Sequence, residues 1–198
     1  LPAVTLLLLL LPLVQAQTPT VRLAVGEAEV LEVRGTVELV RRNQPVSAYS
    51  PLPEGSIVVE GDRIRSGPAG FARLGLVDGS SIELQPGTEL EILDFSGGIR
   101  ELFRIWLGKV RLKIRKLVGS PNPYEMHSPI ATIGVRGTEF EIEVEPNAVT
   151  RVRVYEGLVA VRNDQLPARE VMVDRGKEVT VYPLRPPDPP VTFEQVVA

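Results

Sequence analysis

Apolar and polar residues alternate along most of this chain, and this period of two constrains the fold more than any other feature. Side chains of a β-strand point alternately to its two faces, so the pattern is typical of strands with one buried and one wet face. It is clearest at residues 36–40, 81–84, 89–92, 139–144 and 151–155. Turn residues separate these stretches. The sequence therefore predicts an all-β protein, with about ten short strands in hairpins forming a sandwich, a roll or a solenoid-like stack.

A glycine precedes many of the predicted strands. Two related forms, Gly-x-x-apolar-x-apolar and Gly-x-apolar-x-apolar, recur at Gly35, Gly79, Gly87, Gly108, Gly137, Gly157 and Gly176. Glycine adopts turn conformations that residues with a Cβ resist, so each is expected to form a turn before a strand. Their irregular spacing favours successive hairpins over a strict repeat array.

Two segments of the body depart from the strand pattern. Residues 99–107 place apolar side chains at spacings of three and four, so they are predicted to form either a short helix or the start of a strand. Residues 183–190 hold five of the 18 prolines, which favours an extended, semi-rigid spacer. We therefore expect residues 183–198 to be a Pro-rich tail, or a linker toward a further domain.

The start of the chain has the pattern of a targeting segment. Residues 1–14 are almost wholly apolar, and Val14 and Ala16 offer small residues at the −3 and −1 positions of a cleavage site. We interpret residues 1–16 as a signal peptide. The alternative, a membrane anchor, would need about 20 apolar residues. Residues 17–182 then form one β domain, exported to the periplasm or cell surface, where a protein without cysteine folds without disulfides.

Composition excludes several kinds of catalytic site. The chain has no cysteine, one histidine and a net charge of -3, which excludes thiolate chemistry, Cys-based metal sites and sites built from several histidines. No serine lies in a Gly-x-Ser-x-Gly elbow, and no glycine cluster opens a phosphate loop. The single histidine, His127, is expected to be a surface or edge-strand residue. We therefore predict no enzyme activity, no catalytic, cofactor-binding or metal-binding residues, no cofactor and no nucleic-acid partner.

Two predicted strands carry a row of like charges on one face. One row is cationic (Lys109, Arg111, Lys113 and Arg115) and the other is anionic (Glu139, Glu141, Glu143 and Glu145). The cationic row is either a site for an anionic polymer or the partner of acidic strands in one sheet. Turn residues at 145–150 would fold the acidic strand onto Arg151 and Arg153 as a hairpin. We favour the pairing of rows, because opposite charges across a sheet fix its register.

Seven blocks of sequence occur in the order in which they are found in one known family. They read GTVEL at 35–39, LPEG at 52–55, EGDRIRSG at 60–67, ARL with DGS and PGTEL over 72–90, LGKVR at 107–111, SP with IGVRGTEF over 128–140, and VYEGLV with DRG over 154–176. In this order the stretch from 35 to 182 resembles a FecR-type domain. The resemblance implies a β-rich extracytoplasmic domain that is not catalytic.

The resemblance also implies a class of partner. FecR-type domains transmit or hold protein contacts, so we expect an exported module that binds a protein or a cell-envelope polymer. One alternative is the truncated periplasmic part of an iron-siderophore-type sigma regulator. Another is a glycan-binding or carbohydrate-active protein.

Overall fold

The computed structural model describes residues 23–96, 100–116 and 124–193, and the chain there is almost entirely β-structure with one short 3-10 helix, η1 (Val46–Ala48). The predicted signal peptide at residues 1–16 lies outside the described residues. The strands are β1 (Ala28–Arg34), β2 (Val37–Val40), β3 (Ser50–Pro51), β4 (Ile57–Val58), β5 (Arg63–Ser66), β6 (Phe71–Leu76), β7 (Ser81–Leu84), β8 (Glu89–Ile92), β9 (Arg100–Lys113), β10 (Tyr124–His127), β11 (Ala131–Val135), β12 (Glu139–Val144), β13 (Thr150–Glu156), β14 (Leu158–Asn163), β15 (Glu170–Asp174), β16 (Lys177–Val181) and β17 (Val191–Thr192). The predicted all-β class is confirmed.

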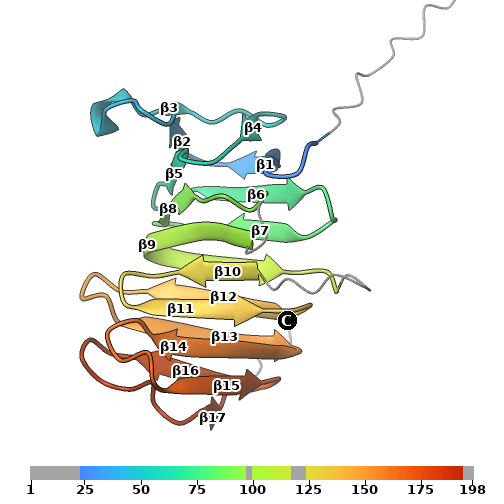
Figure 1. Cartoon of the computed structure of the whole chain (residues 1–198). Coiled ribbons are helices and arrows are strands. Elements are labelled where there is room, and N and C mark those ends of the chain that lie inside the picture. The colour runs from blue at the N-terminus through green and yellow to red at the C-terminus, as the bar shows by residue number, and fades with distance from the viewer. Residues whose placement is uncertain (1–22, 97–99, 117–123, 194–198) are drawn as a thin grey trace, which may run out of the picture.

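The strands form two sheets that enclose a common core and stack along one direction (Figure 1). Sheet A has the order β4–β1–β6–β7–β9–β12–β13–β16–β17. Sheet B has the order β3–β2–β5–β8–β9–β10–β11–β14–β15. Strand β9 belongs to both sheets, so it joins them into one network that does not close into a barrel.

The core lies between the two sheets. Apolar side chains from both sheets form one buried cluster, with Ile64 and Phe103 from sheet B and Leu112 and Phe140 from sheet A all fully buried. Within a strand, buried residues alternate with partly exposed ones, as in β7, β8 and β12. The period-two pattern of the sequence therefore marks the inner and outer faces of a sandwich.

Glycines with a positive φ lie where the chain crosses from one sheet to the other. Such crossings are found at Gly35, Gly55, Gly61, Gly87, Gly108, Gly137, Gly157 and Gly176. At Gly137, between β11 of sheet B and β12 of sheet A, φ is +71° and an added Cβ would lie 2.5 Å from the Cβ of Lys116. Most of the repeated glycines therefore form corners between sheets, whereas successive hairpins were expected; Gly79, by contrast, turns β6 into β7 within sheet A.

Two expectations about elements are resolved by the structure. Residues 100–107 are the first part of β9, so the strand reading of this segment is correct and the helical one is wrong. The described residues contain seventeen strands, more than the expected ten, because the corners divide the chain and because several strands are only two residues long.

The Pro-rich segment continues along sheet A as far as the structure describes it. The Asp188 amide donates to the Thr180 carbonyl oxygen at 3.0 Å, and β17 pairs with β16. The Phe193 ring packs edge-on against Tyr155, with 5.5 Å between ring centroids. Prolines are tolerated here because an edge needs few backbone donors. Residues 183–193, expected as a tail or linker, thus lie against the domain. No helix among the described residues is long and apolar enough to cross a membrane.

Candidate functional site

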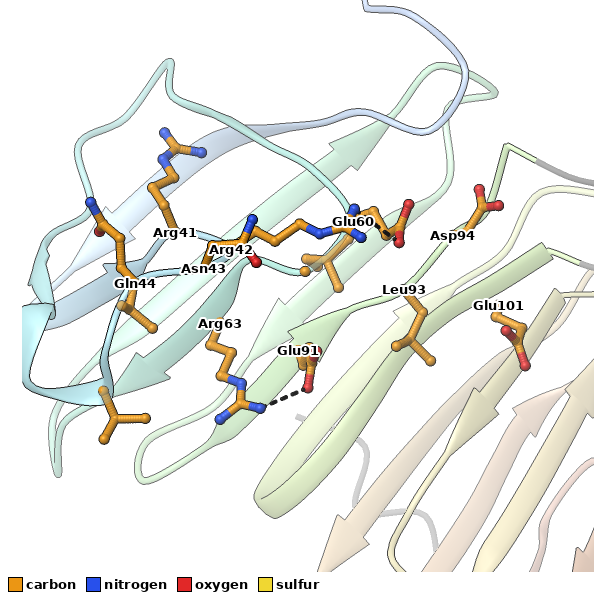
Figure 2. A pocket seen from close by; sticks show the side chains of 14 residues that line it. Arg41, Arg42, Asn43, Gln44, Glu60, Arg63, Glu91, Leu93, Asp94 and Glu101 are labelled. Atoms are coloured by element: carbon orange, nitrogen blue, oxygen red, sulfur yellow. Dashed lines mark ion pairs between the residues drawn. The ribbon is translucent and has the colours of Figure 1, made fainter.

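A charged cleft opens beside strands β2, β5, β8 and β9 of sheet B (Figure 2). Its volume is about 480 Å³. Loops supply most of its lining: the residues after β2, the turn between β4 and β5, and the residues after β8. The charged side chains that line it are Arg41, Arg42, Glu60, Arg63, Glu91, Asp94 and Glu101.

A buried carboxylate holds the loop that carries two of these arginines. Asp62 is only 1% exposed, and its oxygens accept from the Arg42 amide at 3.2 Å and the Val59 amide at 3.1 Å. The guanidinium of Arg41 donates to the same carboxylate at 2.6 Å and to the Ile57 carbonyl oxygen at 2.9 Å. A short carboxylate beside a turn glycine commonly accepts from nearby backbone amides, and Asp62 does so directly after Gly61. Asp62 therefore fixes the arginine side of the cleft.

Ion pairs balance much of the charge in the cleft. Arg42 pairs with Glu60 at 3.2 Å, and Arg63 pairs with Glu91 at 3.4 Å, as Figure 2 shows. These side chains are partly exposed, so each pair contributes only about 0–1 kcal/mol to stability. Guanidinium, carboxylate and amide groups lining an open cleft can recognise charged groups of a partner. No lining residue is a serine, threonine, cysteine, histidine or tyrosine, so the nucleophilic groups of the cleft are carboxylates.

His127 lies near the cleft, on β10, and is half-buried. Its strand has β9 on one side and β11 on the other, so the predicted edge-strand position is wrong. Nε2 lies 3.1 Å from an oxygen of Glu101, and Nδ1 lies 3.1 Å from the hydroxyl of Thr132. The neighbouring Ser128 is buried and accepts a hydrogen bond from Thr150 at 2.8 Å. Ser128 is therefore not an accessible nucleophile beside this imidazole.

The two charged rows of the sequence lie next to each other in sheet A. Strand β12 lies between β9 and β13, so its glutamates have cations on both sides. The nearest ion pairs from β9 are Arg111–Glu139 at 2.6 Å, Lys109–Glu141 at 3.4 Å, Lys109–Glu143 at 3.5 Å and Lys113–Glu139 at 4.0 Å. The predicted pairing of rows and the predicted hairpin onto Arg151 and Arg153 are both confirmed.

Two members of the rows lie outside this pattern of strand pairs. Arg115 follows the end of β9, and its guanidinium lies over Gly79 in the turn between β6 and β7. Glu145 follows β12 and pairs with Arg151 at 3.8 Å. Burial lowers the pKa of Arg111, but its hydrogen bond to Glu139 and the nearby negative charge outweigh burial and leave that pKa raised. The raised pKa shows that the ion pairs stabilise the guanidinium cation of Arg111, which is charged at any physiological pH.

Sequence reasoning missed the cleft altogether. Its arginines and glutamates come from four separate segments, and their meeting depends on strand order and on where each loop turns. The only local signal was Asp62, an acidic residue beside the turn glycine Gly61.

Comparison with known proteins finds matches at the level of family and fold. The family model described as "FecR protein" matches residues 62–160, half of the chain. Two crystal structures of a candidate anti-sigma factor from Parabacteroides distasonis each match with a TM-score of 0.55 and 18% sequence identity. The match covers 66% of this chain and 59% of that chain, so it spans less than two thirds of the neighbour. No curated protein matches.

Proposed function

This chain belongs to the FecR protein family, and we propose that it is an exported, non-catalytic signalling module that acts by binding another protein. The observation that carries the proposal is the family match, which runs from β5 to the first part of β14 and therefore includes strands of both sheets. The fold shared with a candidate anti-sigma factor supports a regulatory role. A sandwich with a charged cleft suits a module that recognises a partner through complementary charges.

Export is the first part of this proposal. It is supported by the apolar segment at residues 1–16, and a chain without cysteine folds in such a compartment without disulfides. A fusion of the chain to a reporter enzyme that is active only outside the cytoplasm tests it. We expect reporter activity with the whole chain and none after removal of residues 1–16. Equal activity without these residues would contradict export through this segment.

Regulation by protein contact is the second part, and the cleft supplies the variant that tests it. Deletion of the gene in its bacterium is expected to change a defined set of transcripts, and the wild-type gene should restore them. Arg63→Glu reverses one charge of the cleft and sets it against Glu91. Because the ion pair that it removes contributes little stability, we expect the variant to fold. Because the charge of the cleft changes, we expect it not to restore the transcripts. Arg175→Glu, at an exposed turn, is the control and should restore them. A deletion without effect on any transcript would contradict the proposal.

A second candidate function is the periplasmic part of a sigma-factor regulator. The observation in its favour is the fold likeness to the candidate anti-sigma factor. Immunoblots of cell fractions separate the two candidates. A product in the cytoplasmic membrane that is larger than this chain favours the regulator, and a processed product free of that membrane favours the exported module.

A further inference from the structure

Strands β9 and β10 pair in parallel and bring three metal-binding side chains together. The register sets Glu101 of β9 directly beside Glu125 of β10. His127 follows Glu125 by two residues on β10, so it points to the same face of the sheet. One ligand atom from each of these residues lies within 4.8 Å of the other two. The groups are on the outer face of sheet B, on strands that are hydrogen-bonded on both sides.

The hydrogen bonds around His127 place the lone pair of the neutral imidazole on Nε2, the ring nitrogen that faces Glu101. The Thr132 hydroxyl donates its single proton to Asp164 at 2.7 Å, so it can only accept from His127 Nδ1. In the neutral ring Nε2 then carries the lone pair, and this atom lies 3.1 Å from a carboxylate oxygen of Glu101. When the ring is neutral and Glu101 is ionised, neither atom can donate to the other, so this contact needs either an added proton or a bound cation.

The charge arrangement around Glu125 is also unusual for this protein. Elsewhere the outer faces set opposite charges side by side, as in sheet A. The pair of Glu101 and Glu125 sets like charges side by side. Glu139 and Glu156 in sheet A are also side by side, but there Arg111 and Lys113 form ion pairs with Glu139. Within residues 23–96, 100–116 and 124–193, no ion pair involves the Glu125 carboxylate. Like charges directly opposite destabilise a sheet, and a bound cation would remove that cost.

We propose that Glu101, Glu125 and His127 bind a divalent transition-metal ion such as Zn²⁺. One imidazole nitrogen and two carboxylate oxygens are ligands that Zn²⁺ accepts. Ligands about 2.1 Å from a tetrahedral ion lie about 3.4 Å from one another, close to the separation of His127 from Glu101. Three protein ligands leave a further position for water or a partner's side chain.

The second layer of the site fits the same ion. The chain of hydrogen bonds from His127 through Thr132 to Asp164 fixes the ring and its tautomer, as in many zinc sites. Arg104 lies beside His127 in the register, but its guanidinium stacks over Trp106, with 5.6 Å to the ring centroid. Glu101 is 47% exposed at its side chain and His127 is 14% exposed, so the ion can enter from solvent.

Zinc titration of the full chain, purified without a polyhistidine tag, tests the site. We expect one Zn²⁺ per chain by calorimetry and a rise in melting temperature. Glu125→Gln should weaken zinc binding at least about tenfold, while the metal-free variant melts at or above the wild-type temperature because a like-charge pair is gone. Glu170→Gln, on the exposed edge of the same sheet, is the control and should bind zinc as the wild type does.

The single histidine provides a direct spectroscopic readout. In a ¹H–¹⁵N spectrum of the imidazole, zinc should shift the Nε2 resonance of His127 and leave a proton on Nδ1. Thr132→Val should weaken binding about tenfold by freeing the ring. An unmoved Nε2 resonance in the folded protein, or wild-type affinity in Glu125→Gln, would overturn the site and leave a simple imidazolium–carboxylate pair.

Discussion

The hydroxyl of Tyr124 connects the two sheets at the level of single residues. It belongs to β10 of sheet B, yet it donates to Asp78 in the β6–β7 turn of sheet A and accepts from Arg100 at 3.2 Å. Burial, followed by the hydrogen bond to Asp78, raises the pKa of Tyr124 to about 12. The sequence predicted the turn at Asp78 and Gly79, but no local pattern could indicate a partner 46 residues away.

This raised pKa predicts a loss of stability in alkali. Below about pH 10 the tyrosine is protonated in both states; between about pH 10 and 12 only the unfolded chain loses the proton, so stability falls as pH rises. Tyr124→Phe should be less stable near neutrality by about 1 kcal/mol, yet lose less stability across that window. Urea unfolding at several pH values measures both effects. Equal pH slopes for the two proteins would show that Tyr124 does not contribute to this loss.

Among the elements, β9 has the largest structural role. Its first part pairs with β8 and β10 in sheet B, and its second part pairs with β7 and β12 in sheet A. Gly108 lies between the two parts with φ at +91°. The helical spacing that obscured this strand in the sequence arises because it bulges and changes sheets, so its apolar residues do not keep one period.

Gly108→Ala should therefore destabilise the whole protein. An added Cβ would lie 2.5 Å from the Gly87 carbonyl oxygen and from the Thr88 Cα, and both are backbone atoms. With the strain of a positive φ, we expect a loss of at least about 2 kcal/mol in unfolding free energy. Gly134→Ala is the matched control, because its nearest neighbour would be 3.9 Å away, and it should change stability by less than about 1 kcal/mol. Equal losses in the two variants would refute the role of the corner.

Over the whole molecule, one row of alternating charges crosses sheet A. The strand register aligns Glu32, Arg73, Glu83, Arg111, Glu141, Arg153 and Glu178. The inner and outer faces could be predicted from the period of two, and part of this row from the charged strands. The cleft and the group around His127 could not, because they depend on strand order and on one parallel pairing across sequence-distant segments.

The central claim is that these charges hold the scaffold in register, and Arg111, in the middle of the row, tests it most directly. Arg111→Glu replaces two attractive neighbours with repulsive ones, and after allowance for solvent screening it should lower the unfolding free energy by about 1–2 kcal/mol. Added salt should reduce the difference. Arg175→Glu, outside the row, should have little effect. The measurement is urea unfolding of the three proteins. Wild-type stability in Arg111→Glu, with loss of binding to an anionic polymer such as heparin, would contradict the claim and assign the cations to a binding site.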